Sequence, residues 1–262
     1  MKQFIFIHSY LLFLLLAILS GCAPVSDSEV THDFGGVQTL KVGISPNAPP
    51  LVFKKEGRIQ GLEIDFARQL GEFLGRKVKF VELSWDKQIT ALEKGDIDVI
   101  MSGMTITGKR SYRVAFSKPY MRSGQILLVR MSQSNKFSSG IYSLMGNQPA
   151  IGVVENTTGD YLITETINRP DLTRYKTSQA AVNALVNEKI DAVVHDAPIL
   201  CYYAAMNGDS LSPILQMATE EYLAWAVKKS DSVLLNELNQ FLDIQESNGD
   251  LKRTIQHWIP YM

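Results

Sequence analysis

Three side chains able to bind a small carboxylate follow one short apolar stretch of this chain. Residues 97–101 read as a buried strand, and the chain breaks at Gly103. Thr105, Thr107 and Arg110 come directly afterwards. Hydroxyl and backbone N–H groups donate hydrogen bonds to an anion, and a guanidinium adds a planar, bidentate fork. The stretch therefore predicts a carboxylate site at the end of a strand; a surface loop with a solvated Arg110 is the alternative.

A second copy of this plan supplies a carboxylate. Residues 184–191 repeat the spacing of residues 91–98, with Ala-Leu, four intervening residues and then Ile-Asp. His195 and Asp196 follow the second copy. If the two halves face each other across a cleft, Arg110 lies on one wall and Asp196 on the other, an arrangement that would bind a zwitterion. A helix N-cap before the following Ala-Pro is the alternative role for Asp196.

The elements around these residues alternate between short apolar strands and helices, in the rhythm of an α/β fold with parallel sheets. Gly61 opens the first helix and Gly75 ends it, and Ser178 is expected to cap the start of a later helix. We expect strands at residues 40–44, 78–83, 97–101, 150–154, 173–176 and 190–194, and helices at residues 61–74, 86–94, from 160 onward and 178–187.

Two further strands, at residues 124–130 and 222–227, connect the halves. Two crossings between lobes form a hinge rather than a loose linker. The returning segment ends in two helices that we expect on the first lobe. The expected organisation has a first lobe at residues 38–127, a second lobe at residues 128–221 and a return to the first lobe at residues 222–262.

The N-terminus has the layout of an export signal. Lys2 precedes an apolar run over residues 4–19, which is short for a membrane span. The Leu-Ser-Gly-Cys that ends at Cys22 resembles a bacterial lipobox. We therefore expect a lipoprotein signal peptide at residues 1–21, lipidation of Cys22 and anchoring to a membrane through that lipid; an ordinary signal with a chance Cys is the alternative. The polar, Gly-rich residues 22–37 are expected to form a flexible tether.

Composition argues against several classes of function. The formal net charge of the 262 residues is -1, which gives no electrostatic footprint for nucleic acid. Once Cys22 carries a lipid, Cys201 has no partner, so no intrachain disulfide is expected. The sequence contains no His, Cys and acidic spacing that suits a metal, no Gly-x-Ser-x-Gly elbow and no phosphate loop, so we expect no cofactor.

The segment around Arg110 resembles the signature of a known family. Gly103 is followed by Thr-Ile-Thr, by Gly-Lys-Arg ending at Arg110, and by Phe-Ser-Lys-Pro-Tyr at residues 116–120. This pattern resembles the family 3 extracytoplasmic solute-binding proteins, the polar amino-acid receptors of ABC importers. The resemblance implies a type II periplasmic binding protein fold, with two α/β lobes joined by two hinge strands around a ligand cleft. It also implies a monomeric, non-enzymatic receptor in the periplasm or at the extracytoplasmic face, which delivers a free amino acid to an ABC permease and ATPase.

The resemblance assigns charged side chains to the two ends of the amino acid. Arg110 would bind its carboxylate, with help from Thr105 and the backbone near Thr158. Asp196 would bind its ammonium, together with the carbonyl of Gly103. Leaving either charge unpaired in a closed cleft would cost about 3–5 kcal/mol, so the cleft is expected to stay open and wet without ligand.

Four further residues concern the side chain of the amino acid. Trp85 lies where the family has an apolar or aromatic wall, with a structural core Trp as the alternative. Ala48 stands where many relatives have a Tyr or Phe that covers the ligand. Ser45 stands where histidine and glutamine receptors have an Asp, and the loss of that Asp argues against a basic amino acid. His195 is either a donor to a polar side chain or a packed residue.

Two other functions stay open. Periplasmic cyclohexadienyl dehydratases, which act on arogenate, resemble this family and share the Ser-Trp that ends at Trp85 and the Met-Ser-Gly that ends at Gly103. They use a Glu as general acid one helical turn after the ammonium-binding Asp, where this chain has Ile199. A solute sensor that acts on a separate partner is the other alternative, since the chain ends at Met262 without room for an output domain.

Overall fold

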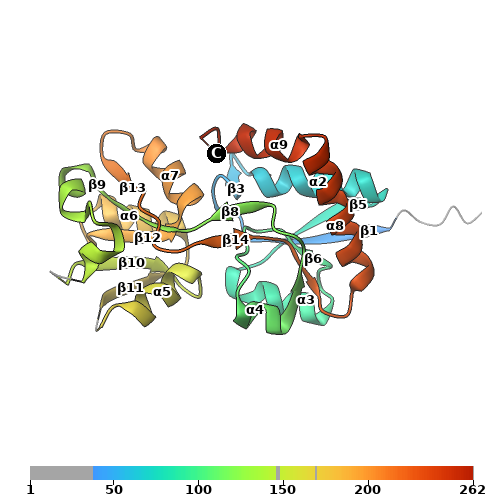
Figure 1. Ribbon diagram of the computed structural model, residues 1–262, viewed down its shortest axis with the longest axis horizontal. Coiled ribbons are helices and arrows are strands. Elements are labelled where there is room, and N and C mark those ends of the chain that lie inside the picture. Colours follow the sequence, from blue (N-terminus) through green and yellow to red (C-terminus); the bar gives the residue numbers. More distant parts are fainter. Residues whose placement is uncertain (1–37, 146–147, 169, 262) are drawn as a thin grey trace, which may run out of the picture. The chain divides into compact units, whose positions relative to one another are not determined.

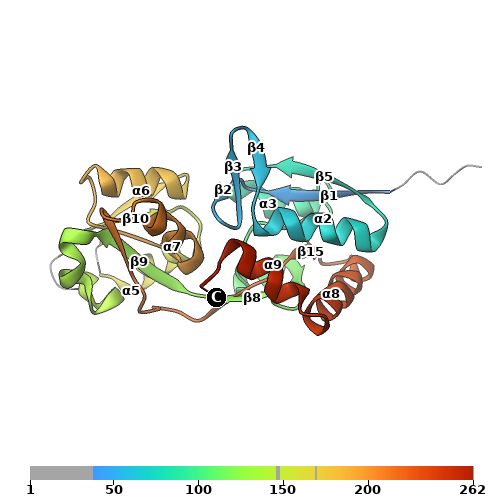
Figure 2. The same cartoon turned by 90° about the horizontal axis from the view of Figure 1, so that it is seen from above.

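The computed structural model describes residues 38–145, 148–168 and 170–261, which form two α/β lobes (Figures 1 and 2). The predicted signal peptide, the lipid-bearing Cys22 and the tether at residues 22–37 lie outside the described residues. Within the described ranges, no helix combines the length and the apolar character that a membrane crossing requires.

The first lobe is built on a five-stranded sheet with the order β5-β1-β6-β15-β7. Strand β1 pairs in parallel with β5 and β6, whereas β15 runs antiparallel to β6 and β7. The alternating Leu40, Val42 and Ile44 of β1 are fully buried and anchor the sheet in the core. The strands are β5 Lys77–Glu82, β1 Thr39–Ile44, β6 Val99–Ile100, β15 Ala226–Lys228 and β7 Val114–Phe116.

Helix α2 carries the apolar face that covers this core. Its Phe66, Ala67 and Leu70 are fully buried, and Gly75 in a left-handed conformation ends the helix. The two C-terminal helices, α8 and α9, pack against α2. The helices are α2 Leu62–Leu74, η1 Trp85–Lys87, α3 Gln88–Lys94, α4 Gly108–Arg113, α8 Ser232–Ser247 and α9 Asp250–Trp258, and a small sheet adds β2 Asn47–Ala48, β3 Val52–Lys55 and β4 Arg58–Gln60.

The second lobe repeats the plan with a five-stranded sheet of order β11-β10-β12-β9-β13. Strand β10 pairs in parallel with β11 and β12, and β9 runs antiparallel to β12 and β13. The strands are β11 Asp171–Tyr175, β10 Ala150–Val154, β12 Ala192–Asp196, β9 Gln125–Arg130 and β13 Leu211–Ile214, and the helices are η2 Met131–Phe137, η3 Gly140–Leu144, α5 Thr158–Thr166, α6 Ser178–Val186 and α7 Ala197–Met206.

Two short strands, β8 Met121–Ser123 and β14 Glu221–Leu223, pair antiparallel where the chain crosses between lobes (Figure 1). Directly after β8 the chain enters the second sheet as β9, and soon after β14 it enters the first sheet as β15. The predicted lobe boundaries, after residues 127 and 221, fall inside β9 and β14.

Two local predictions are wrong. The sheets are mixed rather than parallel, because the strands that arrive from the hinge, β9 and β15, run against their neighbours. Ser178 does not cap helix α6; the side chain of Thr177 accepts the hydrogen bond from Ala180 N instead. The Ser178 hydroxyl donates to the carbonyl of Asn47 at 2.6 Å, a contact between the lobes.

A buried carboxylate joins the core of the first lobe to the segment that carries Arg110. Glu63, in the first turn of α2, is fully buried. It accepts hydrogen bonds from Gly103 N at 2.6 Å, Tyr120 Oη at 2.8 Å and Trp225 Nε1 at 2.9 Å. Burial raises the pKa of Glu63 from 4.5 to about 7, and the three hydrogen bonds oppose this rise. Glu63 therefore fixes the loop at Gly103 to the core.

We expect the change Glu63→Gln to flatten the dependence of stability on pH. Between pH 4.5 and about 7 the folded wild-type protein holds a proton on Glu63 that the unfolded chain releases, so its free energy of unfolding falls as the pH rises. A shift of this size corresponds to about 3 kcal/mol over the window. Chemical denaturation across this pH window measures how the free energy of unfolding changes with pH in wild type and in Glu63→Gln. Glu72→Gln, at an exposed position on the same helix, is the control. Equal slopes for wild type and Glu63→Gln would contradict the prediction.

Candidate functional site

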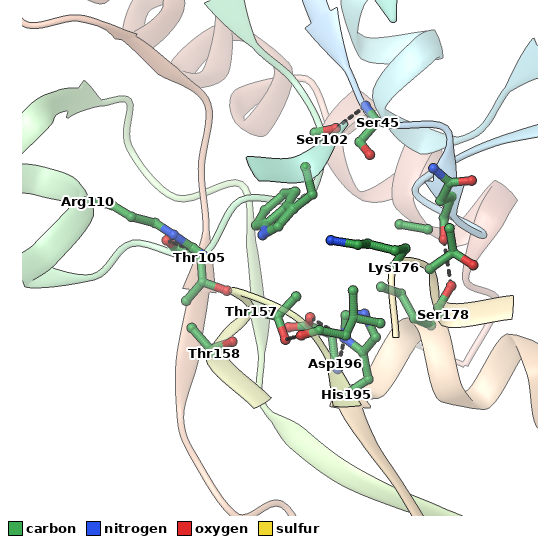
Figure 3. Close-up of a pocket in the computed structure, with 17 residues that line it drawn as sticks. Ser45, Ser102, Thr105, Arg110, Thr157, Thr158, Lys176, Ser178, His195 and Asp196 are labelled. Carbon is green, nitrogen blue, oxygen red and sulfur yellow. Dashed lines mark hydrogen bonds and ion pairs between the residues drawn. The ribbon is translucent and has the colours of Figure 1, made fainter. Parts of the chain in front are cut away.

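A cavity lies between the lobes and is lined by residues of both (Figure 3). The structure brings together around it every residue that the family resemblance relates to the ligand: Ser45, Ala48, Trp85, Gly103, Thr105, Arg110, Thr158, His195 and Asp196. Further residues that line it are Asn47, Ser102, Val154, Thr157, Lys176, Thr177, Ser178 and Ile199.

Arg110 lies in the short helix α4 and is 9% exposed. The Thr107 hydroxyl caps this helix by accepting from Arg110 N at 3.2 Å, so Thr107 positions the guanidinium without lining the cavity. Nη1 of Arg110 donates to the carbonyl of Thr105 at 3.0 Å, and Nη2 donates to that of Asn156 in the second lobe at 3.5 Å. Burial lowers the pKa of Arg110, and the negative charge of Asp196 opposes this. The guanidinium stays cationic and keeps further N–H donors for a carboxylate.

Asp196 is the last residue of β12 and is 6% exposed. Its Oδ1 accepts a hydrogen bond from Gln125 Nε2 at 3.2 Å, and its Oδ2 lies 2.9 Å from His195 Nδ1. Asp196 occupies the N-cap position of α7, but its side chain accepts no hydrogen bond from that helix. The capping alternative therefore does not describe the side chain, which Gln125 holds at the cavity, whereas His195 Nδ1 accepts a hydrogen bond from the backbone N of Asp196 at 2.8 Å.

Trp85 closes one side of the cavity from the first lobe. Its Nε1 donates to the carbonyl of Asn156 in the second lobe at 3.0 Å. The Arg110 guanidinium lies 5.1 Å from its ring centroid, within the range of a cation–π contact. Asn156 has a φ of 60°, a left-handed conformation that Asn adopts more readily than most residues. The indole thus borders the cavity and bridges the lobes, which a purely structural core Trp would not do.

Two first-lobe loops meet beside Gly103. Ser102 Oγ accepts a hydrogen bond from Ser45 N at 2.7 Å, which ties the loop after β6 to the loop after β1. Gly103 has a φ of 68°, and a Cβ on it would lie 2.5 Å from Leu51 Cδ1. A side chain at this position would therefore strain the backbone and crowd the neighbouring core.

Thr105 and Thr158 share a partner that sequence analysis missed. Glu221 of β14 is 8% exposed, and its Oε2 accepts hydrogen bonds from Thr105 Oγ1 and Thr158 Oγ1, both at 2.9 Å. Its Oε1 accepts from Thr219 Oγ1 at 2.8 Å. Glu221 follows another acidic residue, Glu220, and such a pair reads as solvated charge, so no sequence pattern marked it.

The segment after β11 adds polar residues that sequence analysis also missed. Lys176, Thr177 and Ser178 all line the cavity, and Figure 3 shows Lys176 reaching into it. Lys176 forms an ion pair with Glu155 of the same lobe. The rule that pointed to Arg110, polar residues directly after a parallel strand, applies equally to this segment and is the signal that would find it.

Comparisons with known proteins match most of the chain to one family. The family described as bacterial extracellular solute-binding proteins, family 3, matches residues 40–261. A probable histidine-binding protein of Neisseria gonorrhoeae is 27% identical over 208 residues, which cover 78% of this chain and 76% of that protein. The ABC transporter glutamine-binding protein GlnH of Bacillus subtilis is 31% identical over 206 residues, which cover 78% of this chain and 74% of that protein.

A solved structure supports the same fold. An ancestral amino-acid-binding protein, described as a precursor of cyclohexadienyl dehydratase, matches with a TM-score of 0.77 and 33% identity. The match covers 84% of this chain and 94% of that one. The predicted two-lobed fold of type II periplasmic binding proteins is therefore confirmed.

We expect the change Gly103→Ala to destabilise the protein by about 1–2 kcal/mol, because the left-handed backbone disfavours any Cβ. Thermal or chemical unfolding measures the loss. Gly108→Ala is the matched control, since a Cβ there would meet nothing within 4 Å. It should change stability by less than about 0.5 kcal/mol. Equal stabilities of the two variants would show that Gly103 is not under backbone constraint.

Proposed function

The chain belongs to the bacterial extracellular solute-binding proteins, family 3, and from that premise we propose that it is a receptor that binds a free amino acid in its interlobe cavity and delivers it to an ABC importer. The relatives named above bind histidine and glutamine by their descriptions. Their names support an amino acid as the class of ligand without fixing which one.

The observation that carries the proposal is the placement of Arg110 and Asp196. The two side chains come from different lobes, line one cavity and are both nearly buried. A zwitterion offers each of them the opposite charge, so its carboxylate pairs with Arg110 and its ammonium with Asp196. Micromolar affinity needs only about 8 kcal/mol, which one fully paired zwitterion and one stacked wall can supply.

The rest of the lining suits a polar amino-acid side chain. Trp85 offers an aromatic face, and Ala48 leaves room where many relatives have a large aromatic residue. Ser45, Lys176 and His195 offer polar groups at the cavity. Among the described residues that line it, Asp196 carries the sole carboxylate, and the proposed ammonium contact uses that carboxylate.

Ile199 favours a binding protein over a dehydratase. It lines the cavity one helical turn after Asp196 and is 2% exposed. The dehydratases that resemble this family have a general acid at that position, and an aliphatic side chain cannot donate the proton that expels hydroxide.

The location of the receptor follows from the same proposal. Family members act outside the cytoplasm, and the lipobox-like residues that end at Cys22 support attachment to the outer face of a membrane through a lipid. In that arrangement the tether at residues 22–37 lets the two lobes reach the permease while the lipid stays in the bilayer.

We expect thermal unfolding with a panel of the standard amino acids to identify the ligand. A ligand at a hundred times its Kd adds about 2.7 kcal/mol of stability. Arg110→Ala and Asp196→Ala each leave one ligand charge unpaired, at a cost of about 3–5 kcal/mol, so each should weaken binding at least a hundredfold. Titration calorimetry of folded variants measures the loss.

The matched control for these variants is Arg113→Ala. Arg113 lies on the same helix as Arg110 but pairs with Glu93 on the surface, so its loss should leave affinity unchanged. Full affinity in Arg110→Ala or Asp196→Ala would show that the site is elsewhere. If no amino acid of the panel stabilises the protein and the purified protein forms phenylalanine from arogenate, the dehydratase alternative would be favoured.

We expect the change Cys22→Ser to release the protein from the membrane. A hydroxyl in place of the thiol cannot carry the thioether-linked lipid, and the remaining chain has no comparable anchor among its described helices. Fractionation of cells and labelling with a palmitate analogue measure the change. Cys201→Ser is the control and should stay in the membrane fraction with its label. An unlabelled wild-type protein would contradict the lipid anchor.

A further inference from the structure

Glu221 connects the two lobes through a single oxygen atom. Thr105 belongs to the first lobe and Thr158 to the second, and both hydroxyls donate to Glu221 Oε2 at 2.9 Å. Thr219 donates to the other oxygen at 2.8 Å. An ionised carboxylate only accepts hydrogen bonds, and three hydroxyl donors match that state. The proposed contacts to an amino acid make no use of this buried charge.

The hydrogen-bond network fixes where the hydroxyl protons point. Each threonine hydroxyl has one proton to donate. Thr158 Oγ1 accepts from Gln125 Nε2 at 3.0 Å, so its own proton stays on the side of Glu221. Gln125 Nε2 also donates to Asp196 Oδ1 at 3.2 Å, which fixes the orientation of the amide. Thr105 and Thr158 therefore present oxygen lone pairs, rather than protons, to a neighbour in the cavity.

The charge of Glu221 also acts on Arg110. Burial lowers the pKa of Arg110, and Asp196 and Glu221 are among the groups whose negative charge raises it. The negative charges of Asp196 and Glu221 therefore partly offset the positive charge of the Arg110 guanidinium. A carboxylate that binds Arg110 meets the like charge of Glu221, whose effect on Arg110 is smaller than those of Asp196 and Tyr161.

We propose that Glu221 is a positioning residue that weakens the binding of the ligand α-carboxylate, because it turns the protons of Thr105 and Thr158 away and places a negative charge beside Arg110. This inference rests on the proposed function as an amino-acid receptor. It revises one expectation from the family resemblance, in which Thr105 helps to bind the carboxylate. Arg110 and backbone N–H groups then hold the carboxylate without the two hydroxyls.

A weakened carboxylate contact suits a receptor that must hand over its ligand. Differences in affinity between related complexes arise mainly from dissociation rates. A carboxylate held by Arg110 and by two additional hydroxyl donors would leave more slowly than one held by Arg110 in the presence of a like charge. Glu221 therefore favours release when the importer separates the lobes.

The test compares two probes in wild type and in Glu221→Gln. The probes are the amino acid of the panel that stabilises the wild-type protein most and its α-carboxamide, which keeps the ammonium and the side chain but lacks the carboxylate. Titration calorimetry gives the Kd of each probe. The preference for the acid over the amide should rise about tenfold in Glu221→Gln, because the charge beside Arg110 is gone and the threonine protons are less firmly held.

A structural role for Glu221 would weaken both probes equally and leave this preference unchanged, which would overturn the proposal. Glu220→Gln is the matched control, since Glu220 is exposed and contacts Arg122 and Tyr222 on the surface. It should keep the wild-type preference. If Glu221→Gln does not fold, Glu221→Ala removes the same charge and should show the same rise. A wild-type protein that binds no amino acid would instead refute the proposed function, and this inference with it.

Discussion

The parallel strands of both sheets end at one cavity, and the chemistry of the site depends on this constraint. Within two residues of a strand end lie Ser45 after β1, Ser102 after β6, Val154 in β10, Lys176 after β11 and Asp196 in β12, and all of them line the cavity. Side chains beyond a strand end are free of the sheet, so polar groups can gather there without breaking its hydrogen bonds. The chain crosses between the lobes at β8 and β14, so each of the two sheets contributes strand ends to the cavity.

Burial then decides which polar groups can remain there. Arg110, Asp196, Glu63 and Glu221 are all nearly or fully buried, and each has hydrogen-bond partners within the protein. A buried charge without partners would cost several kcal/mol. The hydrogen bonds therefore make the burial of these groups possible and also hold them in position.

Sequence patterns predicted the α/β lobes and pointed to Thr105 and Arg110, which line the cavity, because strand rhythm and a run of hydroxyls before an Arg are local features. The missing information is long-range. Glu221 contacts Thr105 and Thr158 at separations of 116 and 63 positions, and no local pattern reports such pairs. Thr177 rather than Ser178 caps α6, and the Ser178 hydroxyl instead bonds to Asn47, 131 positions away. The direction of β9 and β15 likewise follows from the hinge, which apolar periodicity does not show.

The order of strands in the first sheet has a consequence for biogenesis. The second sheet uses one continuous stretch, from β9 to β13, whereas the first sheet places β15 between β6 and β7. A nascent chain that emerges N-terminus first can complete the second lobe while β6 still exposes an unpaired edge. Trp225, which is fully buried in the finished core, reaches its place only with that last strand. The lobe begun first is thus finished last, and its incomplete sheet stays open to mispairing until the last strand is available.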